Sequence, residues 1–237
     1  MTYTLYYSPD NANVIVRTVL EMLEQPYTDV LVDRSGALQR KSAEFRAMNP
    51  QGQLPVLLVT DQDEPLFETA AILLFLAERH GDLLPADVRQ RGRALKWLFY
   101  LSNTLHADLR VLFNSPRYVA DPVAIPTLRQ AMITRVTGHF ALLDAEIAGS
   151  GGRWLLGGER CSVCDIYLAW CARWALIYPV GQALPRGALA AFPQLSAVLH
   201  RLQDDPAVLR ACAREDIAAP AFTDPVLPQP TRGSVTG

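Results

Sequence analysis

Apolar positions in the first 80 residues follow the spacing of short strands and helices in alternation. Residues 3–7 are aromatic and β-branched, as strands favour. Apolar residues then recur at helical spacing over 14–23, and a second strand-like run covers 29–32. A strand, a helix and a strand in this order predict a parallel pair joined by a right-handed crossover.

The stretch that follows predicts a hairpin between two further helices. A short helix is expected over 42–48, a strand over 55–59 and its hairpin partner at 66–67. The next helix, over 69–80 with Gly81 as its stop, is apolar on nearly every side. Such a helix must be covered by the sheet and also by a second domain or subunit, which predicts a homodimer.

From residue 89 onward the pattern changes to helical periodicity without a convincing strand. Helices are expected over 89–113, 122–148, 162–177, 187–202 and 206–214. We therefore predict an α/β domain over 1–80, a linker over 81–88 and an all-helical domain over 89–217. The remainder, 218–237, is rich in proline and small polar residues and is expected to be a poorly ordered tail.

Composition narrows the class of protein. Half of the 237 residues are hydrophobic, the net charge is −2, and no basic stripe stands out, so nucleic acid and membrane surfaces are poor candidate partners. The longest apolar run, 70–77, is too short to span a bilayer, and the N-terminus lacks a signal-peptide pattern. Four cysteines in the last third of an ordinary chain indicate reduced thiols. These features predict a soluble cytoplasmic protein.

The order of elements also indicates where a ligand binds. A βαβ unit, a helix, a hairpin and a last helix form the layout of thioredoxin, and in open α/β sheets ligands bind beyond the carboxyl ends of parallel strands. Two helices begin at this edge, after Tyr7 and after Phe67. Their free N–H groups and positive dipole ends favour an anionic ligand.

Two short motifs carry a resemblance to a known family. Residues 49–55 read Asn-Pro-Gln-Gly-Gln-Leu-Pro, and residues 68–72 read Glu-Thr-Ala-Ala-Ile. Here the sequence resembles the glutathione S-transferase family, over about residues 4–213, and most closely its serine-type phi and theta classes and its nu-like members. The resemblance implies an α/β thioredoxin-like N-terminal domain, an all-α C-terminal bundle and glutathione as co-substrate, with no metal.

The resemblance assigns the cysteinyl and γ-glutamyl parts of glutathione to specific residues. Pro55 corresponds to a cis-proline of the family, which turns the backbone of Leu54 outward to pair with the cysteinyl unit. Thr69 and its N–H are expected to hold the γ-glutamyl carboxylate at a helix N-terminus. Glu68, or the residues around it, is expected to face the ammonium group.

The glycyl carboxylate is assigned to Gln53 and Lys41. Taken one at a time, each of these assignments has an ordinary structural explanation. Lys41 is as easily a solvated loop lysine, a proline at a strand start is common, and Thr69 serves equally as a plain N-cap. The combination at the right separation is what favours a glutathione site.

The sequence identifies less clearly which residue activates the thiol of glutathione. Lowering a thiol pKa from about 8.5 by about two units requires roughly 2.7 kcal/mol in favour of the thiolate. Asn11 occupies the position of the family's serine and can donate a hydrogen bond, but it cannot act as a base. Tyr7, Ser8 and Asn13 are the alternatives. Ala12 and its neighbours exclude a catalytic cysteine in this loop.

Candidate second-substrate residues lie on the first helix of the predicted helical domain. Asn103, His106 and Arg110 are spaced by three and four residues and would share one face. In the family this helix lines the pocket for the electrophile, although a solvated polar face explains the spacing equally well.

Two further motifs in the second domain are expected to have no catalytic role. Ser162 and Asp165 fit a capping box before an apolar helix, which indicates a stabilising element. Cys161 and Cys164 have CxxC spacing, but they lie at a helix start in the wrong domain for a thioredoxin dithiol, and no second CxxC or histidine completes a zinc set.

The sequence therefore predicts a homodimeric detoxification enzyme that transfers glutathione to a small hydrophobic electrophile. A glutathione-dependent disulfide or peroxide reductase of the nu-like kind is the alternative within enzymes. A binding protein that keeps the fold without the activity is the alternative outside them.

Overall fold

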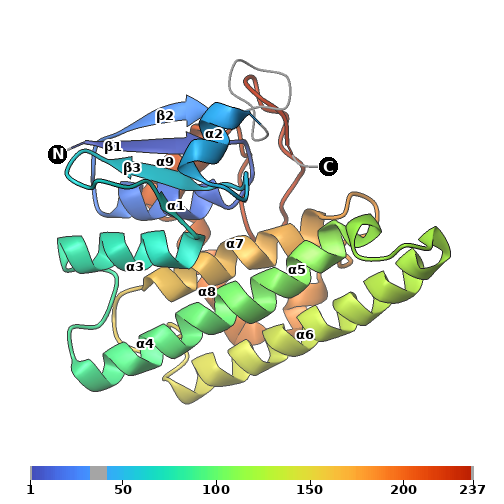
Figure 1. Ribbon diagram of the computed structural model, residues 1–237. Coiled ribbons are helices and arrows are strands. Elements are labelled where there is room, and N and C mark those ends of the chain that lie inside the picture. The colour runs from blue at the N-terminus through green and yellow to red at the C-terminus, as the bar shows by residue number, and fades with distance from the viewer. Residues whose placement is uncertain (1, 33–41, 236–237) are drawn as a thin grey trace. The chain divides into compact units, whose positions relative to one another are not determined.

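The computed structural model describes residues 2–32 and 42–235 (Figure 1). The chain forms two compact units, and each is assembled from separate stretches of sequence. The first unit takes the described part of 1–82, then 205–219 and 226–235. The second takes 83–204 and 220–225. The helix expected near 206–214 thus belongs to the first unit, whereas the sequence pattern placed it in the helical domain.

The first unit contains a four-stranded mixed sheet. The strands are β1 (Tyr3–Tyr7), β2 (Tyr27–Leu31), β3 (Val56–Val59) and β4 (Leu66–Phe67), in the order β2-β1-β3-β4. The pair β1 and β2 is parallel, while β3 is antiparallel to both β1 and β4. This topology confirms the predicted thioredoxin-like fold.

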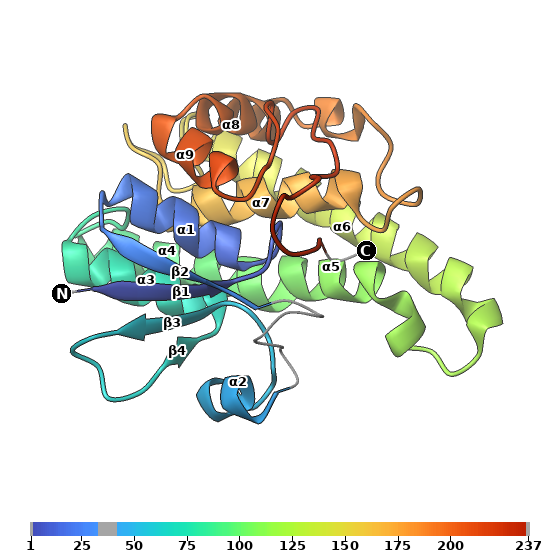
Figure 2. The same cartoon turned by 90° about the horizontal axis from the view of Figure 1, so that it is seen from above.

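Helices cover both faces of this sheet. Helix α1 (Asn13–Met22) packs against α3 (Thr69–His80) and against α9 (Pro206–Ala213). Helix α2 (Ala43–Met48) lies on the opposite side of the sheet from α1 and α9, as Figure 2 shows. There Phe45 packs in a buried cluster with residues of β3. The apolar positions of α1 and α3 are therefore explained by burial on the first face of the sheet.

The second unit is all-helical, which confirms the predicted class of the C-terminal region. Its helices are α4 (Val88–Tyr100), α5 (His106–Phe113), α6 (Ile125–Gly149), α7 (Val163–Ile177) and α8 (Pro193–Gln203). A π-helical turn, η1 (Leu101–Leu105), joins α4 to α5 without a break. Short 3₁₀ turns occur at η2 (Ser115–Arg117), η3 (Pro122–Ala124) and η4 (Ala188–Ala191). No helix in the described parts of the chain is long and apolar enough to cross a membrane.

Helix α7 is buried along nearly its whole length, and a capping box fixes its start. The backbone N–H of Ser162 donates to Asp165 Oδ2 at 2.8 Å, and the Leu155 N–H donates to Asp165 Oδ1 at 2.7 Å. Burial raises the pKa of Asp165, and these donors oppose that rise. The predicted capping box is confirmed, and it also anchors the loop that precedes the helix.

Candidate functional site

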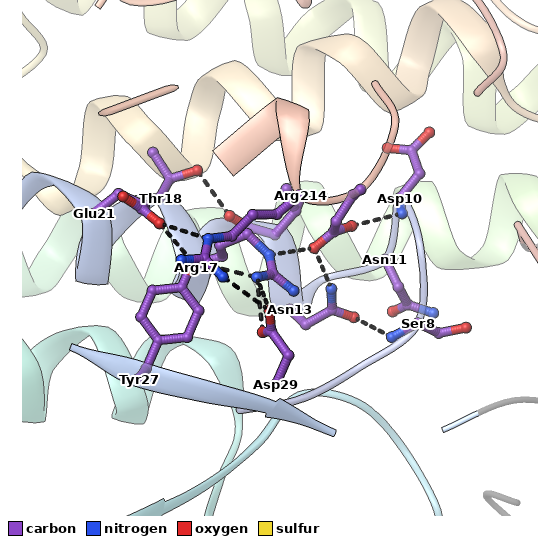
Figure 3. A network of polar contacts seen from close by, with 12 residues as sticks. Ser8, Asp10, Asn11, Asn13, Arg17, Thr18, Glu21, Tyr27, Asp29 and Arg214 are labelled. Atoms are coloured by element: carbon purple, nitrogen blue, oxygen red, sulfur yellow. Dashed lines mark hydrogen bonds and ion pairs between the residues drawn. The ribbon is translucent and has the colours of Figure 1, made fainter. Parts of the chain in front are cut away.

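The loop between β1 and α1 is held by a carboxylate from near the end of the chain. Glu215, which follows α9, is 1% exposed. Its Oε2 accepts a hydrogen bond from the Asp10 N–H at 2.8 Å, and its Oε1 accepts one from Asn13 Nδ2 at 2.9 Å. Asn13 Oδ1 in turn accepts from the Ser8 N–H at 3.0 Å (Figure 3). The carboxylate therefore holds the middle and the end of the loop directly, and it holds the start of the loop through Asn13.

Arg17 on α1 is the counter-ion of this carboxylate. Its Nε lies 2.8 Å from Glu215 Oε1, its Nη1 lies 2.7 Å from Asp29 Oδ1, and its side chain is fully buried. Two aromatic rings, those of Tyr7 and Tyr27, flank the guanidinium at 4.8 and 5.5 Å. Burial raises the pKa of Glu215 to about 7, and the Arg17 charge opposes that rise. The pair survives burial because each charge has several polar partners.

A second carboxylate extends this network along α1 and joins it to α9. Glu21 accepts a hydrogen bond from the Tyr27 hydroxyl at 2.6 Å and pairs with Arg210 Nε at 2.8 Å. Arg214 lies 3.2 Å from Glu21 and 3.4 Å from Asp29. Charged side chains thus hold α9 against α1, in addition to apolar packing.

The four candidate activators of the thiol differ in what they contact. Asn13 is fully buried, and both ends of its amide are used within the fold. Tyr7 is 5% exposed and lies over Arg17, while the Ser8 hydroxyl donates to the Ser234 carbonyl at 3.4 Å. Asn11 is half-buried, and its Oδ1 accepts from the Ala12 N–H at 2.7 Å, which fixes the orientation of the amide. Asn11 is the most exposed of the four.

The loop before β3 is shaped by Asn49, whose role the sequence motif did not reveal. Its Nδ2 donates to the Gln53 carbonyl at 2.9 Å, and its Oδ1 accepts from the Gln51 N–H at 3.1 Å. The Leu54–Pro55 peptide bond is cis, as the resemblance implies. These bonds hold the backbone of residues 49–55 in one conformation.

The start of α3 has a special backbone conformation. Glu68 has φ of 70°, a left-handed value that costs a residue with a side chain of the order of 1 kcal/mol or more. Its side chain is exposed, and the next residue, Thr69, is 7% exposed at the first turn of α3. Strained residues of this kind cluster at active sites and ligand clamps, so the start of α3 is a candidate binding position. Lys41, the remaining expected ligand, lies outside the described residues.

Strand register brings the three loops to one edge of the sheet. Tyr6 on β1 pairs with Val56 on β3, and Val56 pairs with Phe67 on β4. The chain therefore leaves β1, enters β3 through Pro55 and leaves β4 toward Glu68 at the same edge. Hydrogen-bonded strands are about 4.8 Å apart, so these segments can contact one small molecule together. The backbone before β3 lies beside the N-terminus of α3, which is the positive end of the helix dipole. This combination suits a peptide ligand that carries carboxylates.

The candidate second-substrate residues lie where α4 passes into α5. Asn103 belongs to the π-helical turn, so its position relative to His106 departs from regular α-helical spacing. Asn103 and Arg110 are exposed. His106 Nδ1 lies 2.9 Å from the Tyr167 hydroxyl, and its ring lies 5.3 Å from that of Trp174. Burial lowers the pKa of His106 to about 4, so it is neutral at physiological pH.

The CxxC pair shows no sign of a reactive dithiol. Cys164 is fully buried, and its thiol donates to the Ala94 carbonyl at 3.5 Å. Burial raises the pKa of this thiol, so thiolate is disfavoured. Across the described ranges, no group of three histidine, cysteine or acidic residues is placed to hold a metal ion.

Comparison with known proteins gives two matches to family models. A family model described as glutathione S-transferase, N-terminal domain, matches residues 1–78. A second, described as a domain of unknown function (DUF7962), matches residues 112–212.

Three relatives cover most of the chain. Glutathione S-transferase GstB of Escherichia coli (strain K12) is 35% identical over 173 residues, which cover 70% of this chain and 79% of that protein. Disulfide-bond oxidoreductase YfcG of the same strain is 28% identical over 219 residues, covering 90% of this chain and 95% of that protein. A glutathione transferase family member from Pseudomonas fluorescens, solved with two glutathione bound, is 26% identical with a TM-score of 0.73, covering 88% and 91%.

The buried pair predicts a strong energetic coupling between distant parts of the chain. Replacing Glu215 by Leu should lower the free energy of unfolding by about 3–5 kcal/mol, because Arg17 then keeps a buried charge without that partner. Arg17→Met should cost a similar amount, and the double variant should lose clearly less than the sum. Urea denaturation of the four proteins measures this cycle.

An exposed ion pair is the matched control for that cycle. Arg135 pairs with Asp108 at 2.8 Å, but its side chain is 55% exposed. Arg135→Met should therefore cost less than about 1 kcal/mol. Additive losses for Arg17 and Glu215 would show that the two residues contribute independently.

Proposed function

Because this chain belongs to the glutathione S-transferase family, we propose that it is a glutathione transferase. It binds reduced glutathione, stabilises the thiolate and transfers it to a small hydrophobic electrophile. The observation that carries the proposal is the register that brings the loops after Tyr7, before Val56 and after Phe67 to one edge of the sheet.

Each part of glutathione has a complementary group at this edge. The backbone of Leu54, beside the cis peptide bond to Pro55, pairs with the cysteinyl unit. Thr69 and the N–H groups at the start of α3 bind the γ-glutamyl carboxylate, and the exposed Glu68 carboxylate faces the ammonium group. Gln53, together with Lys41, binds the glycyl carboxylate.

Asn11 is assigned as the group that stabilises the thiolate. Its amide is held by the bond to the Ala12 N–H, on a loop that Glu215 fixes through Asp10 and Asn13 on either side of it. A donor oriented before the ligand arrives needs no reorganisation when the thiolate forms. Transfer then consists of attack by sulfur on the electrophile, and the site contributes orientation and proximity.

Glutathione bound to Asn11→Ala should have a thiol pKa raised by about one unit, since one hydrogen bond to the anion is lost. Asn11→Ser should restore much of the effect, and Asn11→Asp should raise the pKa further by repelling the thiolate. Thiolate absorbance followed against pH in the protein–glutathione complex measures all three. An unchanged pKa in Asn11→Ala would assign the donor role to another group.

Glutathione-dependent disulfide reduction is the second candidate. The similarity to a disulfide-bond oxidoreductase over 90% of the chain favours it, as does the relative solved with two glutathione bound. The first glutathione thiolate attacks the disulfide and releases one thiol, leaving a mixed disulfide. A second glutathione thiolate then attacks the glutathione sulfur of that mixed disulfide, so that the other thiol leaves and oxidised glutathione forms. No protein cysteine takes part.

Assays with a chloronitrobenzene and with hydroxyethyl disulfide distinguish the two reactions. We expect turnover of the chloronitrobenzene, and we expect Asn11→Ala to reduce it at neutral pH because less thiolate is present. Cys161→Ser, which changes a half-buried thiol in the other unit, is the control and should leave the rate unchanged. Turnover of the disulfide alone would replace the transferase proposal with the reductase.

The proposal extends to a cytoplasmic homodimer. In α3, Leu74 and Phe75 remain half-buried although most apolar residues of the helix are covered. A second copy of the chain would bury them. Light scattering should therefore give twice the 26.2 kDa mass of one chain, and Phe75→Glu should shift it toward one chain. A single-chain mass for the unaltered protein at micromolar concentration would contradict the dimer.

A further inference from the structure

The last described residues, 226–235, return to the first unit and lie beside the β1–α1 loop. Their anchor is Thr231, whose N–H and hydroxyl both donate to Asp216 Oδ2, at 2.7 and 2.8 Å. The pKa of the Asp216 carboxyl is lowered by these two donors. Asp216 follows Glu215, so the same stretch of chain holds both the loop and the C-terminal segment.

Gly233 brings this segment into close contact with the site edge. Its φ is 77°, and a Cβ at this position would lie 2.9 Å from Leu31 Cδ1 and 3.1 Å from Pro9 Cδ. One residue further on, the Ser234 carbonyl accepts from the Ser8 hydroxyl at 3.4 Å. A residue with a side chain at 233 would push the segment away from the end of β2 and from the loop.

Arg232 lies between these two anchors, and its side chain is exposed. Burial raises the pKa of Tyr7, and the charges of Arg232 and Arg17 both oppose that rise. Arg17 lies 4.8 Å from the Tyr7 ring and is paired with Glu215 and Asp29. Arg232 has no ion-pair partner within 2–32 and 42–235. Arg232 therefore carries an exposed positive charge on a segment whose next two residues, Gly233 and Ser234, lie against Leu31, Pro9 and Ser8.

We propose that the C-terminal segment 226–235 is a wall of the glutathione site and that Arg232 is the cation that favours the bound thiolate. The inference rests on the proposed function, because it names a further residue of the same site. An exposed guanidinium next to an anionic sulfur stabilises the thiolate through its charge, in addition to the hydrogen bond assigned to Asn11. The segment contributes to the site because it carries this cation beside the β1–α1 loop.

The test follows the thiolate absorbance of bound reduced glutathione against pH in the full-length protein. Arg232→Gln should raise the thiol pKa by about half a unit to one unit, and Arg232→Lys should keep most of the effect because the charge remains. In the unaltered protein, raising the salt concentration should raise the thiol pKa, and this dependence should weaken in Arg232→Gln. Arg89→Gln, which removes an exposed arginine of α4, is the matched control and should change neither quantity.

The Gly233→Val variant tests whether the Arg232 charge must lie beside the loop, because it keeps the charge and changes its position. This variant keeps Arg232 but clashes with Leu31 and Pro9, so the segment should detach and the thiol pKa should rise as in Arg232→Gln. An unchanged pKa in Arg232→Gln, while the unaltered protein binds glutathione with a lowered thiol pKa, would overturn this inference and leave the proposed function intact. Absence of glutathione binding to the unaltered protein would instead overturn both.

Discussion

The buried ion pair between Arg17 and Glu215 is the constraint on which the first unit depends. Charges removed from water are tolerated when they are paired and hydrogen-bonded, and here 198 residues of chain separate the two partners. The chain must therefore return to α1 after it has built the second unit. That return places α9 on α1, and it also brings Asp216 and residues 226–235 to the same part of the sheet.

The same carboxylate links stability to the geometry of the site. Glu215 accepts hydrogen bonds from Asp10 and Asn13, so the loop that carries Asn11 is fixed by a group whose main partner is in the core. A loop that is fixed in advance can present a donor to a developing thiolate without paying for its own ordering. Changes in the core of this unit are therefore expected to alter the chemistry of the site without touching the ligand.

The two halves of the proposed reaction draw on different parts of the chain. In the proposed site, glutathione contacts mainly backbone features: the cis bond before Pro55, the left-handed Glu68 and the start of α3. The electrophile pocket is predicted from side chains near the α4–α5 junction, where a π-helical turn interrupts the regular spacing and His106 lies against Tyr167 and Trp174. Backbone geometry tolerates much sequence change, whereas a pocket of side chains changes with each substitution. The co-substrate is therefore easier to identify than the electrophile.

Local pattern in the sequence determined the strands, most helices, the capping box at Ser162 and the motifs around Pro55 and Thr69, because each depends on residues a few positions apart. The family followed from those motifs. Tertiary structure alone decided what depends on distant partners. Three such features leave no periodic trace in the sequence: the pairing of Arg17 with Glu215, the inclusion of α9 in the first unit and the contact of Ser234 with the β1–α1 loop. An ion pair across 198 residues is specified by the complete fold, since neither partner's neighbours along the chain carry information about the other.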